Sequence, residues 1–386
     1  MSTRRSFLYA AAGLTAALSV APSRVLAAPL KSMRIFIGTY TSGASKGIYT
    51  GMLDADSGAI ADVRLVAEAE QPSFLAISPD QRFLYAVNEL DTFDGSPGGA
   101  VSAYAINGRT GELRFLNQQP TRGAHPCHII TDRTGRWALV ANYSGGNLAA
   151  LSIGLDGHLA APTTVVQHTG SSVNASRQEA PHAHSVHLDA KNRYVVAADL
   201  GLDKLMVYQW DARSGVLKPN EPASLATAPG AGPRHFAWHP SGQYAFVINE
   251  LNSTLSALSY DGGSGTFIER HTLSTLPEGF AGTNSCADIH VAPGGRFVYG
   301  SNRGHDSIAV FGFDARAGQL TALAHTSTEG ATPRNFGIAP GGRLLLAANQ
   351  QSDTIVSFAI DRRSGLLNRV ASAEVPTPVC IQFIEG

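Results

Sequence analysis

The chain has 386 residues, with 29 Lys and Arg against 30 Asp and Glu, 40 glycines and 20 prolines. This near-neutral balance offers neither a basic field for nucleic acid nor a polybasic patch for lipids, so we expect no nucleic-acid partner and no membrane partner. The cysteines Cys127, Cys286 and Cys380 lie far apart. Their odd number argues against a disulfide framework, and their spacing indicates neither a zinc site nor a redox pair.

The first 28 residues have the order of an export signal. Paired arginines open the segment, an Ala-, Leu- and Val-rich run follows from 10 to 21, and residues 25–27 supply a small-residue cleavage site. The arginine pair is typical of the twin-arginine route. We therefore predict that residues 1–28 are removed and that residues 29–386 form a single domain, soluble in the periplasm.

A predicted hairpin recurs along the rest of the chain. In the copy at 231–250, residues 234–239 alternate like a strand, 240–243 form a turn, and 244–248 form a short apolar run. Further copies begin at Gln71, His125, Pro181, Cys286 and Thr332. A period of about 45 to 55 residues is typical of propeller blades.

Turns of the form Asp/Asn-x-x-x-Gly alternate with these hairpins. They lie at 54–58, 107–111, 211–215, 261–265, 314–318 and 361–365, with a shortened copy at 155–157. Each is flanked by alternating strands and so indicates the outer hairpin of a four-stranded blade. Seven such turns predict an all-β fold, a seven-bladed β-propeller.

Only six inner hairpins are complete, and the chain ends supply the missing one. Residues 377–384 resemble an isolated first strand, and residues 34–40 an isolated second strand. We predict that the N- and C-terminal strands close the seventh blade, with the C-terminal strand innermost. Closure of this kind removes open sheet edges.

Comparison of the copies separates architecture from chemistry. A polar residue at the end of the second strand is shared, which favours a structural hydrogen bond; it is Asn88, Asn142, Asp199, Asn249, Asn302 or Asn349. Other polar residues are peculiar to single copies and should meet around one mouth of the channel. The catalytic candidates are His184, Arg234, Glu250 and Arg303. The substrate-binding candidates are His182, His128, His235, His305, Arg334 and Gln350.

Simpler interpretations stay open at this stage. Arg234 and Glu250 lie opposite each other in one hairpin and could be a structural ion pair. The insertions at 91–99, 167–179 and 278–285 could be ordinary loops or a cover for the site. A metal at His182 and His184 lacks a clear third ligand, so we predict no metal and no cofactor. The set of imidazole, carboxylate and guanidinium groups suits attack by water on an ester carbonyl.

Five motifs carry a family resemblance: Pro-His-Ala-His ending at His184, Asp-Leu-Gly-Leu-Asp ending at Asp203, Gly-Pro-Arg-His ending at His235, Asn-Glu-Leu ending at Leu251, and Ser-Asn-Arg-Gly-His ending at His305. With them the chain resembles the seven-bladed propeller lactonases, which include bacterial 6-phosphogluconolactonase and fungal carboxy-muconate cyclase. The resemblance implies metal-independent lactone chemistry. It also implies catalytic roles for Arg234 and Glu250, with His184 and Arg303 as the best positional matches for a further His and Arg.

The leading hypothesis is a hydrolase of sugar lactones that acts as a monomer on an anionic or polyhydroxylated lactone. In it His184 and Glu250 handle the proton of the water, while Arg234 and Arg303 bind the anionic substrate and the oxyanion. One alternative is a lactonising enzyme of the muconate-cyclase type. Another is a propeller that binds a ligand without catalysis.

Overall fold

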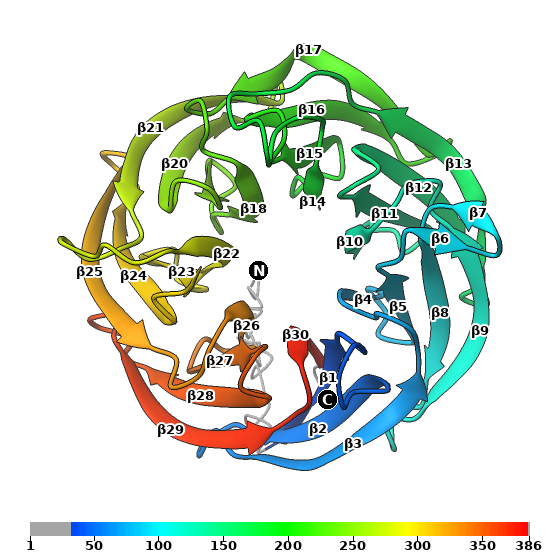
Figure 1. The fold of residues 1–386 in the computed structure, drawn as a ribbon, viewed down its shortest axis with the longest axis horizontal. Coiled ribbons are helices and arrows are strands. Elements are labelled where there is room, and N and C mark those ends of the chain that lie inside the picture. The colour runs from blue at the N-terminus through cyan, green and yellow to red at the C-terminus, as the bar shows by residue number, and fades with distance from the viewer. Residues whose placement is uncertain (1–31, 385–386) are drawn as a thin grey trace, which may run out of the picture. The chain divides into compact units, whose positions relative to one another are not determined.

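The structure, a computed structural model, describes residues 32–384. The predicted export signal, residues 1–28, lies outside the described residues. Within the described range the chain forms seven four-stranded antiparallel sheets arranged as a ring around a central axis (Figure 1). No helix long and apolar enough to cross a membrane occurs between Ser32 and Ile384. The prediction of an all-β, seven-bladed propeller is confirmed.

Each blade runs outward from the axis, strand by strand. The innermost strands are β4 (Leu75–Ile77), β10 (Pro126–Thr131), β14 (Ala183–Leu188), β18 (Pro233–Trp238), β22 (Ser285–Val291), β26 (Pro333–Ile338) and β30 (Pro378–Ile384). The second strands are β5 (Phe83–Asn88), β11 (Trp137–Asn142), β15 (Tyr194–Asp199), β19 (Tyr244–Asn249), β23 (Phe297–Arg303), β27 (Leu344–Asn349) and β1 (Ser32–Thr39).

The outer half of each blade is a second hairpin. Its third strands are β8 (Ala100–Ile106), β12 (Asn147–Ile153), β16 (Lys204–Asp211), β20 (Thr254–Asp261), β24 (Ser307–Asp314), β28 (Thr354–Ile360) and β2 (Gly47–Asp54). The outermost strands are β9 (Leu113–Pro120), β13 (Leu159–Gln167), β17 (Val216–Ala226), β21 (Thr266–Ser274), β25 (Gln319–Ser327), β29 (Leu367–Glu374) and β3 (Ile60–Glu68). A small ladder of β6 (Thr92–Phe93) and β7 (Ser96–Pro97) lies in the connection from β5 to β8.

The two ends of the described chain close the ring as predicted. Strand β30 pairs antiparallel with β1, from Arg34 opposite Ile384 to Thr39 opposite Pro378, and the blade order is β3-β2-β1-β30. The C-terminal strand is therefore the innermost strand of a blade whose other three strands come from the N-terminal part (Figure 1). Because one blade contains strands from both ends, the ring is closed by strand pairing within a sheet rather than by a loop.

The core lies between neighbouring blades. Along β5, Tyr85 and Val87 pack toward β10 and β11, whereas Leu84 and Ala86 pack toward β1 and β2. Successive side chains of a strand point to opposite faces, so a strand buried on both faces must be apolar throughout. This explains the continuous apolar runs of the second strands.

The Asp-x-x-x-Gly turns form the outer hairpins through one mechanism. In the turn at 361–365, Oδ1 of Asp361 accepts hydrogen bonds from the backbone N–H groups of Arg363 (2.8 Å) and Ser364 (2.9 Å). Gly365 adopts φ = 78°, where an added Cβ would come within 2.4 Å of the Phe297 ring. The aspartate shapes the turn, and the glycine permits its conformation and its contact with the next blade.

The polar residue shared at the end of the second strand is structural. Nδ2 of Asn88, Asn302 and Asn349 donates to the backbone carbonyls of Glu70 (2.7 Å), Thr275 (2.8 Å) and Thr328 (3.0 Å), respectively. Each carbonyl belongs to the connection that arrives from the outermost strand of the preceding blade. These three side chains therefore tie successive blades together, whereas Asn142 and Asn249 donate within their own blades, to Asn147 and Thr254.

Candidate active site

A β-bulge recurs near the start of the innermost strands. The pairing of β10, β14, β18 and β26 with their second strands skips one residue there. The skipped residues are Cys127, His184, Arg234 and Arg334. A bulge re-aims the side chains beside it, so Arg234 and the adjacent His235 line the same pocket. Simple alternation along a strand would have sent these two side chains to opposite faces.

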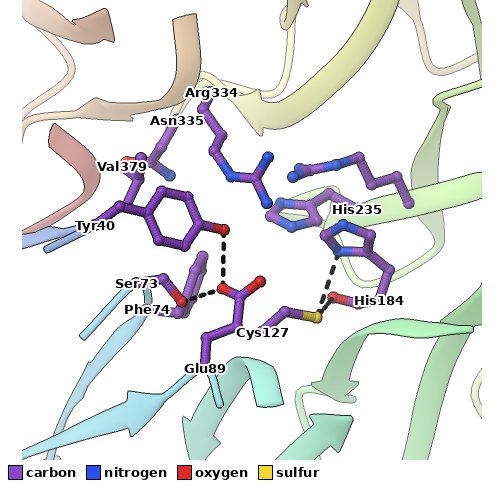
Figure 2. Close-up of a pocket in the computed structure, with 11 residues that line it drawn as sticks. Tyr40, Ser73, Phe74, Glu89, Cys127, His184, His235, Arg334, Asn335 and Val379 are labelled. Carbon is purple, nitrogen blue, oxygen red and sulfur yellow. Dashed lines mark hydrogen bonds between the residues drawn. The ribbon is translucent and has the colours of Figure 1, made fainter. Parts of the chain in front are cut away.

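The pocket beside these bulges lies among the innermost strands of the ring, and Figure 2 shows the side chains that line it. About 250 Å³ of space lies between its lining side chains, part of it open to solvent. Its lining comes from Tyr40, Ser73, Phe74, Glu89, Cys127, His184, Arg234, His235, Arg334, Asn335 and Val379. Side chains from most of the ring thus meet at one place, as the repeat predicted. Of the predicted residues, His184, Arg234, His235 and Arg334 belong to this lining.

Glu250 and Arg303 stand directly behind Arg234. Oε2 of Glu250 accepts hydrogen bonds from Nε of Arg234 (2.9 Å) and forms an ion pair with Nη2 of Arg303 (2.9 Å). Its Oε1 accepts one from Nη2 of Arg177 (2.6 Å). Both carboxylate oxygens are occupied, and three guanidinium groups gather around one carboxylate. The ion pair predicted across the hairpin is therefore part of a larger network.

The network sets the charge states. Burial alone would raise the pKa of Glu250, but Arg303, Arg234 and Arg177 outweigh burial and lower the pKa to about 2. Burial and the neighbouring charges of Arg303 and Arg334 lower the pKa of Arg234 to about 10, which leaves it protonated at neutral pH. Glu250 is thus a fixed anion whose oxygens are in use, and it is poorly suited to accept a proton.

A second polar group occupies the opposite side of the pocket. Glu89 accepts hydrogen bonds from the hydroxyl of Tyr40 (2.9 Å) and from Oγ of Ser73 (Figure 2). The guanidinium of Arg334 lies 5.2 Å from the centre of the Tyr40 ring. Among the described residues Arg334 has no hydrogen-bond or ion-pair partner, so its donors remain available to a ligand.

His184 lies between these two groups. Its Nδ1 is 3.8 Å from the sulfur of Cys127, and its ring packs edge-on against Tyr143 and His235. Burial, together with the positive charges of Arg234 and its neighbours, holds the pKa of His184 well below 6.5. The imidazole is therefore neutral at physiological pH and can accept a proton.

A second buried carboxylate, Asp288, lies below the pocket. Its Oδ1 is 2.7 Å from Nδ1 of His235, and its Oδ2 is 3.1 Å from Nε2 of His290. Nδ2 of Asn335 also donates to Oδ2, at 2.5 Å. Burial and the charge of Arg234 lower the pKa of His235 to about 4, although Asp288 opposes the shift. Asp288 fixes the orientation of His235, which forms part of the pocket floor.

Four predicted binding residues do not line the pocket. His182 stacks on Tyr143 at 4.5 Å, and its Nδ1 is 3.1 Å from the carbonyl oxygen of that residue. His128 lies below the pocket, 4.3 Å from Phe74 between ring centres. His305 pairs through Nδ1 with Ser307 (2.7 Å). Gln350 is also absent from the lining. His182 still supports the site, because it holds the tyrosine that packs against His184.

Neither His182 nor Asp199 is arranged as a metal ligand. Asp199 accepts a hydrogen bond from the backbone N–H of His182 (2.8 Å) and pairs with Nδ1 of His168 (2.6 Å). Between Ser32 and Ile384 no group of three or more His, Cys, Asp or Glu side chains is placed to hold a metal ion.

Among the residues that sequence reasoning did not propose for the site are Tyr40 and Arg177. Tyr40 follows β1 just as Glu89 follows β5 and Glu250 follows β19, so the repeat itself could have identified it. Arg177 lies in the insertion at 167–179, which has no counterpart in other blades. Only the position of that insertion beside the mouth pointed toward the site.

Comparison with known proteins agrees with this architecture. Residues 34–383 match the family described as "Lactonase, 7-bladed beta-propeller". The chain belongs to this family, as its motifs predicted.

Three relatives illustrate the similarity. The 6-phosphogluconolactonase of Bacillus subtilis is 40% identical over 301 residues, which is 78% of this chain and 83% of the relative. That of Erwinia tasmaniensis is 32% identical over 77% of this chain and 82% of its own length. The solved structure of a periplasmic gluconolactonase from Pseudomonas aeruginosa is 34% identical, with a TM-score of 0.86 over 92% of this chain and 99% of that one.

Proposed function

We propose that this protein hydrolyses sugar lactones at the axial pocket. The observation that carries the proposal is the convergence of a neutral histidine with four guanidinium groups, those of Arg177, Arg234, Arg303 and Arg334. Two carboxylates, Glu89 and Glu250, lie among them. The surplus of cations suits the oxyanion that forms when water attacks a lactone carbonyl. The names of the relatives support a sugar lactone as the substrate.

The arginines orient the substrate in this mechanism. Nε of Arg234 is bound to Glu250 and Nη1 donates to the carbonyl oxygen of Ala287 (2.6 Å), so its guanidinium is held in one plane. Arg334 presents unoccupied donors from the other side of the pocket. The carbonyl oxygen of the lactone binds between these two side chains. Donors that are fixed in advance need no reorganisation as negative charge develops on that oxygen.

His184 accepts the proton of the attacking water. The water oxygen forms a bond to the carbonyl carbon as its proton moves to the imidazole. When the tetrahedral intermediate collapses, the ring C–O bond breaks, and the imidazolium returns the proton to the departing alkoxide oxygen. The products are one hydroxyl group and one carboxylic acid, which ionises in solution. Glu250 stays ionised throughout and keeps the three arginines in place.

The location remains a prediction, which two observations support. The order of elements in residues 1–28 is typical of a twin-arginine signal. The name of the Pseudomonas relative places that protein in the periplasm. We propose that this protein acts there as well, on lactones outside the cytoplasm, and that it does so as a monomer.

A titration of released acid tests the function. Purified protein would be given gluconolactone, its 6-phosphate, a uronolactone and a muconolactone, with Arg234→Ala measured beside the wild type. We expect sugar lactones to open faster than they do spontaneously, and the variant to lose most of that rate. Wild-type rates equal to the spontaneous rates would contradict the proposal, and opening of the muconolactone alone would favour the cyclase alternative.

A further inference from the structure

Arg177 joins the site from outside the repeat. It lies in the connection between β13 and β14, and its Nη2 donates both to Oε1 of Glu250 (2.6 Å) and to the hydroxyl of Tyr143 (3.2 Å). The two partners belong to different blades. The side chain of Arg177 is 40% exposed, whereas that of Glu250 is 7% exposed. The guanidinium therefore lies between the buried network around Glu250 and the solvent.

The hydrogen bonds of Arg177 leave much of its guanidinium unused. Both of them involve the same nitrogen, Nη2. With respect to residues 32–384, Nη1 and Nε donate no hydrogen bond. A guanidinium carries five N–H donors in a planar fork, which matches the oxygens of a carboxylate or a phosphate. Arg177 is thus held in position while donors suited to an anion remain available.

Charge points to the same conclusion. Glu250 is already paired with Arg234 and Arg303, so Arg177 adds a positive charge beyond what this carboxylate neutralises. Glu250 and Tyr143 also limit the rotamers of a long side chain, so less conformational entropy is lost when a ligand binds. Fixed, partly exposed and in surplus, this guanidinium has the features of an anion-binding group.

We propose that Arg177 forms an anion subsite that binds the carboxylate or phosphate of a charged sugar lactone, while the lactone carbonyl lies at Arg234 and His184. This inference rests on the proposed function and names the substrate class. The subsite selects lactones with a negative group distant from the ester. It contributes to binding and not to the chemical step, so its loss raises KM more than it lowers kcat.

The test compares kcat/KM for gluconolactone, its 6-phosphate and a uronolactone in wild type and Arg177→Gln. The expected result is a fall of roughly 10- to 100-fold in the preference for charged over neutral lactone, mostly through KM, since hydrogen bonds between charged groups are strong. Neutral-lactone activity falls by a smaller factor, because Glu250 loses one partner. If kcat/KM falls more for the 6-phosphate, the group bound is a phosphate; if it falls more for the uronolactone, the group is a carboxylate.

Two further variants separate binding from support of the loop. Arg177→Lys keeps the charge but loses the fork, so it should retain part of the preference. Arg213→Gln, on an exposed outer turn, is the matched control and should leave the preference unchanged. The subsite would be overturned if Arg177→Gln left the preference for charged over neutral lactones unchanged. If both activities also fell by the same factor, Arg177 would be a loop anchor. If the wild type opens no sugar lactone, the proposed function itself fails.

Discussion

Two buried carboxylates in neighbouring blades have opposite kinds of partner. Glu250 follows β19 and is surrounded by the guanidinium groups of Arg177, Arg234 and Arg303. These partners stay charged at any physiological pH. Together they exceed the charge of the carboxylate, and some of their donors remain unused. The region around Glu250 is therefore organised to receive a further anion.

The partners of Asp288, on β22, carry less positive charge than those of Glu250, and they give both carboxylate oxygens hydrogen bonds. They are the imidazoles of His235 (2.7 Å) and His290 (3.1 Å), the amide of Asn335 (2.5 Å) and the backbone N–H groups of Ile289 (2.9 Å) and Phe336 (3.3 Å). None of them carries a permanent charge. A buried acid with such partners needs no ligand, so we assign Asp288 to stability and to the orientation of His235. We assign Glu250 to positioning the arginines that bind the substrate.

The sharpest test of this contrast is Arg234→Lys. Lysine keeps the charge but loses the fork that contacts Glu250 and Ala287. We expect kcat/KM for a sugar lactone to fall roughly 10²- to 10³-fold, the cost typical of a lost oxyanion donor. Steady-state kinetics beside Arg213→Lys as the control measures it. A change in kcat/KM below threefold would show that Arg234 does not stabilise the transition state.

Glu250→Gln should have the next largest effect on activity. A neutral amide leaves three guanidinium groups without their common anion, so they repel one another and shift. Misplacement of positioning groups by about 1 Å costs on the order of 10² in rate, and we expect a fall in kcat/KM of that order. Activity close to that of the wild type would mean that the arginines need no anchor.

Asp288→Asn should affect stability rather than activity. Hydrogen bonds to a charged group contribute roughly 1.5–3 kcal/mol each, so the loss of the charge should lower the free energy of unfolding, measured by denaturant titration, by about 3 kcal/mol. We expect kcat/KM to fall less than tenfold, because the pocket residues that Asp288 holds, His235 and Asn335, have no part in the proposed chemical step. A loss of activity as large as in Glu250→Gln would erase the difference between the two carboxylates.

The smallest expected effect is on the decrease of the free energy of unfolding at acid pH. The pKa of Glu250 is about 2 in the folded protein, against 4.5 for an unperturbed glutamate. Its stabilising contribution is therefore complete above pH 4.5 and is lost as the pH falls toward 2. In Glu250→Gln the free energy of unfolding should fall less steeply with decreasing pH across this range. The difference in slope should correspond to the one proton that Glu250 binds in the unfolded wild type and the variant lacks. Parallel curves for the two proteins would show that the carboxylate titrates normally.

Much of the fold could be predicted because repeats constrain one another. The turns at 54–58 through 361–365 set the number of blades, and the unpaired strands near Arg34 and Ile384 required closure by the two ends. Arg234 and Glu250 could be paired because a hairpin turn fixes which residues lie opposite each other. Position relative to the repeat was enough for these features.

The rest depends on geometry that residue spacing does not encode. The bulges at His184 and Arg234 carry no signal in hydrophobic alternation, yet they aim both side chains at the axis. His305 and Gln350 follow strands that end at the channel mouth. The direction of a side chain just after a strand depends on local contacts, such as that of His305 with Ser307. Arg177 belongs to an insertion with no other copy to compare, so nothing in the repeat could place it against Glu250.

The most direct test of the account is the pH dependence of kcat/KM for a sugar lactone in wild type and His184→Gln. Since burial and nearby arginines hold the pKa of His184 well below 6.5, the wild-type profile should be level at neutral pH and fall only at distinctly acid pH, where the imidazole becomes protonated. The variant should be slower by roughly 10²- to 10⁴-fold and lack this limb. The same acid limb in both proteins, or a variant as fast as the wild type, would contradict the assignment of His184 as the proton acceptor.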